Sequence, residues 1–470
     1  MSSSFLALER TVARPGFSRW LVPPAAIAVH MCIGEVYGFS VFNVPLTRAI
    51  GITQSVKGQD WTIPQVGWIY SIALIMLGLS AAFLGKWVER QGPRRTMFTS
   101  ACCFCGGLVV ASVGVSLHNL WIVYLGYGVI GGIGLGLGYI APVSTLVKWF
   151  PDRPGMATGM AIMGFGGGAL VGAPFTVELM NHFKSAASIG VSETFLVMAA
   201  CYFVMMNVGS LIVRVPPPGW LPEGFTPAAQ SSKLVTNAHV LADDAIKTPQ
   251  FWLLWCVLCL NVTAGIGILG QASLMCQDMF GVTAAVAGGF AGLLSIFNMA
   301  GRFLWSSTSD YTGRKGVYCI YFILGATLYA LIPVTQHTHS EAYFVAVTAI
   351  IISMYGGGFA TVPAYLRDLF GTMQVGAIHG RLITSWSMAA VLGPQLVNYI
   401  STYQKEHGVP KAEAYNSTMY LMAGLLLLGL VCNLLLHAVH PRHHFQEDSE
   451  PSRGPDRAPS HPSQPEAARG

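Results

Sequence analysis

The sequence predicts an all-α, polytopic membrane protein whose twelve transmembrane helices form two six-helix halves. Three observations support this fold class. Only 10% of the 470 residues are charged and 53% are hydrophobic, whereas a soluble domain carries ~25% charged residues. Apolar runs of about 20 residues, the length that spans a bilayer, recur along the chain. Several acidic, glycine and proline residues of the first half also have counterparts in the second half at one fixed sequence separation.

The apolar runs give the expected positions of the helices, with boundaries good to a few residues. They cover residues 20–46, 63–85, 96–117, 121–149, 155–181, 193–213, 251–280, 283–309, 316–335, 342–369, 378–402 and 414–438. Each run is long enough and apolar enough to cross a membrane. The chain is therefore expected to cross the bilayer twelve times.

The segments around these runs complete the predicted organisation. Residues 1–19 are polar and are expected to form an N-terminal segment, not a signal peptide. The two halves are expected at 20–214 and 251–440, joined by a Pro- and Ala-rich linker at 215–250. Residues 441–470 are rich in Pro, Ser and His with almost no large apolar residues, so they are expected to be disordered.

Lys and Arg predict the orientation, because cytoplasmic loops carry an excess of them. With the N-terminus in the cytoplasm, 20 of the 26 basic residues fall on the cytoplasmic side and Arg302 falls within the membrane. The other five fall outside: Arg48, Lys57, Lys184, Lys405 and Lys411. We therefore expect a multi-pass protein of the cell membrane, inner or plasma, with both termini cytoplasmic.

An internal repeat relates the two predicted halves. Four pairs of residues are each separated by 221 positions, and the members of each pair fall in corresponding places of the two halves. The pairs are Glu89 and Asp310, Gly92 and Gly313, Pro142 and Pro363, and Gly159 and Gly380. Transporters are commonly built from such repeats, with the binding site near the midplane between them.

Two loops of this repeat have an expected role in gating. Each combines an acidic residue at a helix end, a glycine for a sharp turn and a basic cluster, which together can pin two helices at the cytoplasmic face. Ordinary membrane anchoring explains the charges but not the repeated spacing. The expected gating residues are Glu89, Arg90, Gly92, Arg94, Asp310, Gly313, Arg314 and Lys315.

Arg302 is the first candidate for binding a ligand. An arginine at bilayer depth costs ~2.5–3.5 kcal/mol on insertion scales, so it normally faces a water-filled cavity or a partner. Ser295, Asn298 and Arg302 are spaced i, i+3 and i+7 and share one helix face. The alternative is an arginine that snorkels to the cytoplasmic surface, but Asp310 lies eight residues further on.

Other motifs in the chain do not indicate catalysis or cofactors. Residues 126–131 match G-x-G-x-x-G, but they lie inside an apolar helix, where small residues serve close helix packing. Cys256 and Cys259 have C-x-x-C spacing without a second pair, which favours packing over metal binding. No nucleophile–base pair is visible and no basic patch carries interleaved aromatics. We expect no enzyme activity, cofactor, metal or nucleic-acid partner.

The acid-x-x-Gly-basic loops at repeat spacing resemble those of the major facilitator superfamily, which implies the major facilitator fold. Further segments are similar to the oxalate/formate antiporter family: Tyr139–Pro142 leading to Lys148–Gly155, Thr248–Trp252, and Asn298 with Arg302 before Ser309 and Asp310. This likeness runs from about Trp20 to His437. It implies uptake or exchange of small carboxylates by alternating access.

The resemblance also implies a binding site. In the family's oxalate exchanger, an arginine of the eighth helix and a lysine of the eleventh hold the dianion, and aromatic residues line the cavity. Arg302 matches that arginine, and Tyr37, Tyr139 and Tyr355 fall where cavity aromatics occur. Trp386 falls at or beside the lysine position, and the predicted eleventh helix contains no lysine.

This departure changes the expected substrate. A dianion in a dry site needs two positive charges, because an unpaired buried charge is costly, and the predicted cavity offers only Arg302. A monocarboxylate such as formate, lactate or pyruvate would balance one arginine. The alternatives are an oxalate-type dicarboxylate antiporter with a cation not identified in the sequence, or a transport-dead membrane sensor. We expect a functional monomer in the lipid bilayer.

Glu35 is a second charge in an apolar run and the candidate for proton coupling. It is two residues from Tyr37, about 200° around an ideal helix, so both face the cavity only if Gly34 and Gly38 loosen the helix. Otherwise Glu35 has a structural partner on a neighbouring helix. A Glu35 in the cavity would take up a proton together with a monocarboxylate, because burial and a nearby negative charge favour the protonated acid.

Overall fold

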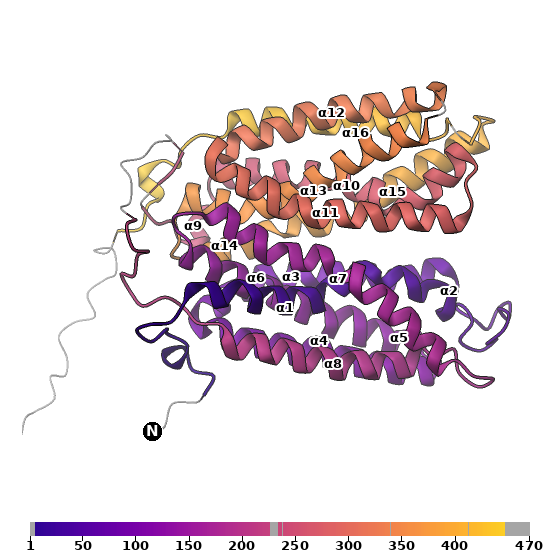
Figure 1. Ribbon diagram of the computed structural model, residues 1–470, viewed down its shortest axis with the longest axis horizontal. Helices are drawn as coiled ribbons and strands as arrows, with labels where there is room; N and C mark the ends of the chain where they lie inside the picture. Colours follow the sequence, from indigo (N-terminus) through magenta and orange to yellow (C-terminus); the bar gives the residue numbers. More distant parts are fainter. Residues whose placement is uncertain (1–4, 226–233, 237, 339, 412, 447–470) are drawn as a thin grey trace, which may run out of the picture.

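The computed structural model describes residues 5–225, 234–236, 238–338, 340–411 and 413–446. Within these ranges the regular elements are helices, with one isolated β-bridge between Val12 and Val215. Figure 1 shows two layers of helices, one built by the first half of the sequence and one by the second half. The predicted all-α class is therefore confirmed.

The first half contains six long helical segments. Their elements are α1 (Val22–Gly34), the 3-10 helix η3 (Glu35–Phe42) and α2 (Asn43–Leu46), α3 (Ile63–Gln91), α4 (Pro93–Ser116), α5 (Leu120–Val123), the π-helix η4 (Tyr124–Gly131) and α6 (Gly132–Trp149), α7 (Pro154–Phe183), and α8 (Val191–Ile212). The first and fourth segments change helix type along their length, which their apolar composition does not reveal.

The second half repeats this arrangement. Its elements are α10 (Pro249–Phe280), α11 (Ala284–Thr312), α12 (Arg314–Thr338), α13 (Glu341–Phe370), α14 (Val375–Leu382), α15 (Thr384–Glu406) and α16 (Asn416–Leu435). The single helix expected at 378–402 is wrong, because α14 ends before Ile383 and α15 begins after it.

Ten helices of the described chain are long and apolar enough to cross a membrane. They correspond to ten of the twelve predicted spans. The other two predicted spans coincide with α11, which carries Arg302, and with the pair α14 and α15. The chain is thus a multi-pass membrane protein, and the count of twelve crossings stays a prediction.

Local sequence signals fix several helix ends. Thr62 and Gln65 form a reciprocal capping box at the start of α3, and the Thr248 side chain caps α10. Gly92 and Gly313 follow α3 and α11 with φ of 78°, a left-handed conformation that glycine adopts without a steric penalty. These are the two glycines for which sharp turns are predicted.

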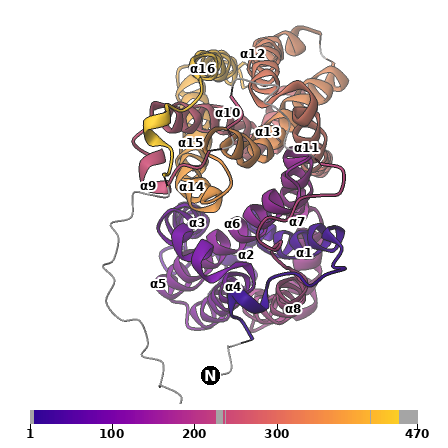
Figure 2. The same cartoon turned by 90° about the vertical axis from the view of Figure 1, so that its left-hand side faces the viewer.

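The two halves meet most closely at one end of the bundle. We call this the linker end, because the linker between the halves lies there (Figure 1). Figure 2, viewed from this end, shows α7 beside α11 and α3 beside α14. Small residues permit the approach: a Cβ added to Gly159 would lie 2.1 Å from Ser306 Oγ, and one added to Gly380 would lie 2.1 Å from the Ala81 carbonyl oxygen.

The described part of the linker packs against the second half. The backbone amides of Thr236 and Val240 donate to carbonyl oxygens at the end of α13, at 2.9 and 3.0 Å, and a short helix α9 (Ala242–Ala245) follows. Residues 226–233 and 237 of the predicted linker lie outside the described residues. The tail expected to be disordered begins with a short 3-10 helix, η5 (Pro441–His443), and residues 447–470 lie outside the description.

Candidate functional site

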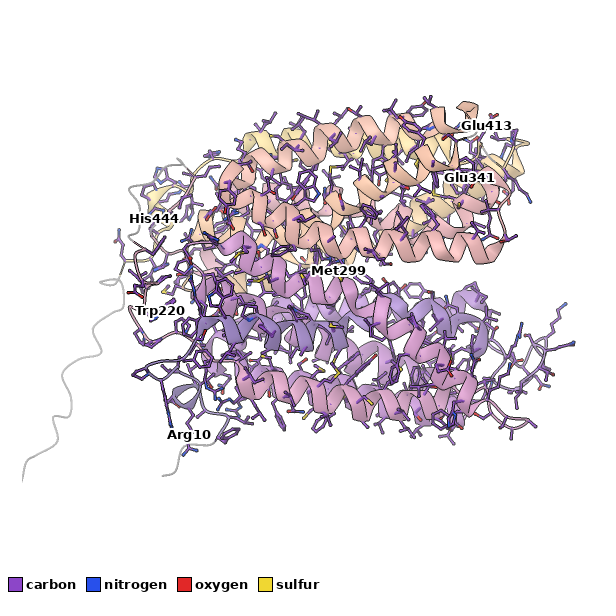
Figure 3. All side chains as sticks on the ribbon, viewed as in Figure 1. Arg10, Trp220, Met299, Glu341, Glu413 and His444 are labelled. Carbon is purple, nitrogen blue, oxygen red and sulfur yellow. The ribbon has the colours of Figure 1, made fainter. Side chains whose placement is uncertain are left out.

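Arg302 is fully buried in α11, at the boundary between the two halves. Its Nε donates to Asn298 Oδ1 at 3.1 Å, one turn earlier on the same helix, and its Nη1 donates to the Ile162 carbonyl oxygen of α7 at 3.3 Å. Its Nη2 has no hydrogen-bond partner among the described residues. Met299, labelled in Figure 3, marks the level of this site between the halves. A buried guanidinium with an unused donor is suited to hold an anion.

Aromatic rings surround the guanidinium. The Arg302 Cζ lies 5.8 Å from the ring centroids of Tyr37 and Phe165 and 5.1 Å from that of Phe359. These distances fall within the range of cation–π attraction. The rings come from both halves, so the positive charge is shielded from water by a cage that neither half could build alone.

Further unused hydrogen-bond donors lie around the same cage. The Tyr139 hydroxyl and the Trp386 Nε1 are buried and have no partner among the described residues. The hydroxyl of Ser385, the residue before Trp386 on α15, is also buried without a partner there. Phe359 lies between Arg302 and the rings of Tyr139 and Trp386. Its ring centroid is 5.5 Å from that of Tyr139 and 5.6 Å from that of Trp386. Buried polar groups are usually hydrogen-bonded, so this set of donors indicates a ligand that supplies acceptor oxygens.

A cavity of about 630 Å³ leads toward this site from the end opposite the linker end. Tyr37, Gly166 and Asn298 line it and also contact Arg302, whereas Arg302, Tyr139 and Trp386 are not among its lining residues. The Tyr37 and Tyr355 hydroxyls lie 3.3 Å apart, across the two halves. The arginine therefore lies behind a layer formed by Tyr37 and Asn298 in this conformation.

The predicted gating loops join the halves at the linker end. Glu89 Oε1 accepts a hydrogen bond from the Gly376 amide at the start of α14, at 2.9 Å. Asp310 accepts from the Gly155 and Met156 amides at the start of α7, both at 2.8 Å. A carboxylate is stabilised at a helix N-terminus by the free amides and the helix dipole. Each acid therefore holds a helix of the opposite half.

The basic residues of these loops have different surroundings. Arg314 pairs with Asp310 at 2.7 Å and with Asp368 at 3.2 Å. Lys315 donates to the Leu434 and Leu436 carbonyl oxygens near the end of α16, at 2.7 and 2.8 Å. Arg90 is exposed.

Arg94 is the remaining basic residue of the first predicted loop. The contacts that the described residues show for it are with the N-terminal segment of its own half. Its Nη1 donates to the Phe5 carbonyl oxygen at 3.1 Å.

An ion pair of the linker also bridges the halves. Asp243 of α9 pairs with Lys86 of α3 and with Arg381 of α14, the latter at 2.6 Å. Hydrogen bonds from Lys86 and then Arg381 lower the pKa of Asp243 to about 2. Asp243 therefore remains a carboxylate at every physiological pH.

Glu35 lies away from the Arg302 cage. It is buried at the junction between α1 and η3, and its Oε1 accepts a hydrogen bond from Thr176 of α7 at 3.3 Å. Its Oε2 has no partner among the described residues and would lie 2.1 Å from a Cβ added to Gly172. The helix does change form at Gly34, but the carboxyl group faces α7 and is not part of the cavity lining.

Sequence reasoning did not find several residues of the site. Phe165 and Phe359 are apolar residues in apolar helices, so nothing in the pattern separates them from ordinary core. His30 lies with its ring nitrogens 2.8 and 3.2 Å from the carbonyl oxygens of Ala161 and Tyr139. His379 contacts the Tyr139 ring at 5.5 Å. Their histidine character in apolar runs was the available signal.

Comparison with known proteins gives consistent matches over most of the chain. The sequence model of the Major Facilitator Superfamily matches residues 17–363 and 291–465. The oxalate:formate antiporter of Oxalobacter formigenes is 25% identical over 82% of this chain and 85% of its own length. The apicoplast pyruvate carrier 1 of Toxoplasma gondii is 24% identical over 90% of each chain.

A solved structure matches the fold as well. The transporter FucP in its outward conformation superposes with a TM-score of 0.62, at 11% identity, over 88% of this chain and 99% of that one.

Proposed function

Because the chain belongs to the Major Facilitator Superfamily and is a membrane transporter, not an enzyme, we propose that it carries small monocarboxylates by alternating access. The observation that carries this proposal is the Arg302 cage. Within the described residues, the buried guanidinium has no partner at Nη2, and the nearby donors of Tyr139 and Trp386 are also unused. A carboxylate supplies the acceptor oxygens that these donors lack. Arginine binds carboxylates through two parallel hydrogen bonds.

The charge of the site supports a substrate with one carboxylate group over a substrate with two. Arg302 provides one positive charge, which a monocarboxylate such as formate, lactate or pyruvate neutralises. The rings of Phe165, Phe359 and Trp386 would pack on the carbon end of the substrate. The names of two relatives, an oxalate:formate antiporter and a pyruvate carrier, support small carboxylates as the class.

Alternating access follows from the two ends of the molecule. The cavity reaches toward the cage from one end, while the acids Glu89 and Asp310 hold the halves together at the other. We propose that the halves rock about the cage, as in other repeat-built transporters. The excess of Lys and Arg supports a cytoplasmic position for the linker end. We further propose that the protein acts as a monomer in the cell membrane.

Transport would be coupled either to the exchange of a second anion or to the symport of a proton. Glu35 is our candidate for the proton site, because its Oε2 is buried without a partner among the described residues and no ion pair joins it to a cation there. A buried carboxyl in such surroundings is more stable with a proton. Glu35 lies against α7. A proton on Glu35 would therefore influence substrate binding through the helices of the first half.

A second candidate function is exchange of a dicarboxylate such as oxalate, and the printed name of one relative, an oxalate:formate antiporter, is the observation that favours it. A dianion would need a second cation in addition to Arg302. We rank this function second, because a second buried charge is costly until the dianion is bound.

Uptake into proteoliposomes tests the proposal. Labelled acids with one to four carbons, offered with and without unlabelled acid inside, should give saturable uptake of monocarboxylates. Uptake that requires internal acid identifies exchange, and uptake driven by an inward proton gradient identifies symport. A preference for dicarboxylates would overturn the monocarboxylate assignment, and a lack of uptake for every acid would overturn transport of this class.

A further inference from the structure

A second cavity, which is lined by arginines, lies apart from the central site, at the linker end of the first half. It has a volume of about 940 Å³ and is enclosed by the N-terminal segment, the first turn of α4 and the residues after α8. Figure 3 labels Arg10 at this end of the molecule. The charged residues in its lining are Glu9, Arg10, Arg14, Arg94 and Arg214. Among the described residues, four cations and one acid therefore line this cavity.

Arg94 is the buried member of this group, with 2% of its surface exposed. Its Nη1 donates to the Phe5 carbonyl oxygen at 3.1 Å, and its Cζ lies 4.8 Å from the centroid of the Phe5 ring. Its Nε and Nη2 have no hydrogen-bond partner in the described parts of the chain. Glu9 lines the same cavity, but no hydrogen bond joins it to Arg94 in the described residues. Buried donors without partners are costly, so the two unused donors indicate a missing acceptor group.

The position of Arg94 on its helix strengthens this conclusion. It is the second residue of α4, a helix of 24 residues. The N-terminus of a helix is its positive end, where a cation is destabilised and an anion is stabilised. The guanidinium and the helix dipole would therefore act on a bound anion in the same direction.

Arg214 adds to the positive field from the other wall. Burial, followed by the charge of Arg14, lowers the pKa of the Arg214 guanidinium. Its Nη1 donates to the Leu211 and Val213 carbonyl oxygens at the end of α8. Like charges gathered in this way repel one another, and an anion between them would remove the repulsion.

The wall formed by the N-terminal segment is held in place by backbone bonds. The Ala13 amide donates to the Val215 carbonyl oxygen at 2.9 Å, and the Val215 amide donates to the Thr11 carbonyl oxygen at 3.0 Å. The Leu8 side chain covers Gly92, where an added Cβ would lie 2.5 Å from it. The cavity therefore has a defined shape, and it lies where α4 begins and α8 ends.

We propose that this cavity binds a phosphate group through Arg94, with Arg214 and Arg14 as further contacts. Guanidinium groups match phosphate geometry and donate paired hydrogen bonds to it. The phosphate belongs either to the headgroup of an anionic phospholipid or to free inorganic phosphate. Leu211, whose carbonyl oxygen accepts a hydrogen bond from Arg214, has an exposed apolar side chain. This residue is at the end of a helix that is apolar enough to span a membrane, which favours a lipid headgroup as the source. A bound phosphate would tie the N-terminal segment to the first half.

Thermal unfolding of the purified full-length chain in detergent tests the site. The probes are phosphatidylglycerol, phosphatidylcholine and inorganic phosphate, each titrated separately. The variants are Arg94→Gln and Arg95→Gln, which remove the same charge from neighbouring positions. Arg95 is exposed and pairs with Gln91, so it is the matched control. We expect phosphatidylglycerol to stabilise the wild type and Arg95→Gln, and to bind Arg94→Gln about tenfold more weakly.

Comparison of the three probes also identifies the source of the phosphate. Stabilisation by phosphatidylglycerol but not by inorganic phosphate assigns a lipid headgroup, and stabilisation by inorganic phosphate alone assigns a free anion. Equal stabilisation of all three proteins, or of none, overturns the proposal. If Arg94→Gln does not fold, Arg214→Gln replaces it with the same expectations, since Arg214 is only partly buried at a helix end.

Discussion

The Asp310 carboxylate accepts a hydrogen bond from the backbone amide of Gly155 at 2.8 Å, across the boundary between the two halves. Glu89 and Gly376 repeat this contact at 2.9 Å. Both members of the second pair are offset by 221 residues from their counterparts, so the contact obeys the internal repeat. One acid from each half thus closes the linker end by capping a helix of the other half.

Removing either acid should open this end. Asp310→Asn and Glu89→Gln lose a charge-assisted cap, worth ~1.5–3 kcal/mol, so the population open at the linker end should rise about tenfold or more. In a cysteine-free background, a cysteine at Ser144 reports this opening, because Ser144 is buried beside Gly376. Its rate of modification should rise in both variants. Glu413→Gln, which removes a charge from an exposed residue, should leave that rate unchanged.

Substitution of Arg302 should remove transport without unfolding the protein. Arg302→Ala loses two charge-assisted bonds to the substrate, which predicts a fall in uptake of about 10²-fold or more. Arg302→Lys should also fail largely, because an ammonium lacks the planar fork. Initial uptake rates in proteoliposomes, together with unfolding temperatures, separate loss of function from loss of fold. Leu304→Ala on the exposed face of α11 is the control, and near-normal uptake by Arg302→Ala would rule out the site.

A second cation in the cage should change the preferred substrate. Trp386→Lys or Ser385→Lys places an ammonium near Arg302, which should raise affinity for dicarboxylates relative to monocarboxylates. Competition of oxalate and formate with labelled substrate measures the ratio. Tyr403→Lys adds the same charge at a partly exposed position of α15 outside the cavity lining. A folded Trp386→Lys protein that keeps monocarboxylate uptake and gains no affinity for dianions would contradict the charge argument.

The ion pairs of Asp243 with Lys86 and Arg381 should stabilise the closed linker end only weakly. This stabilisation should not depend on pH near neutrality. The folded-state pKa of Asp243 is lowered to about 2, below the ordinary value of 3.8. The stabilisation is thus complete above about pH 4 and is lost as the pH falls through about 2. Asp243 is 56% exposed, so Asp243→Asn should cost ~0–1 kcal/mol and less at high salt. The modification rate of the Ser144→Cys reporter, compared with and without Asp243→Asn at low and at high salt, checks this. The ratio of the two rates is taken at the same pH, because thiol reactivity itself depends on pH. A large change of that ratio between pH 5 and 8 would exclude this account.

The parts of this architecture that are local in sequence could be predicted. Hydropathy locates the helices because each one must be apolar along its own length. The 221-residue repeat locates the caps, and Arg302 stands out because a charge is rare in an apolar helix. In each case the sequence itself contains the contrast that identifies the feature.

Features that depend on which helices pack together were not predictable. Phe165 and Phe359 have no contrast with their apolar neighbours, although both contact Arg302. Arg94 was grouped with the gating residues by its loop, but its surroundings are set by the N-terminal segment, 89 residues away from it at Phe5. The break at Ile383 likewise comes directly after α14, a short helix that packs against α3 of the other half.

Glu35 carries a buried carboxyl group on the first helical segment. Its Oε1 accepts one hydrogen bond, from Thr176, and its Oε2 has no partner within the described chain. A carboxylate in this position would be an uncompensated buried charge, whereas a protonated acid is neutral. We therefore expect Glu35 to hold a proton through part of the transport cycle, so that an inward proton gradient drives uptake by the wild type.

Glu35→Gln separates coupling from structure, because the amide has the shape of the protonated acid but cannot release a proton. The variant should keep exchange of internal for external substrate and lose its response to the proton gradient. Thr176→Val removes the hydrogen bond that the carboxyl group accepts from Thr176, and this variant should keep that response. If wild-type uptake ignores the gradient, or if the Gln variant still follows it, then Glu35 is a structural residue that packs α1 on α7. In that case the carrier is an anion exchanger whose driving force is the gradient of the second carboxylate.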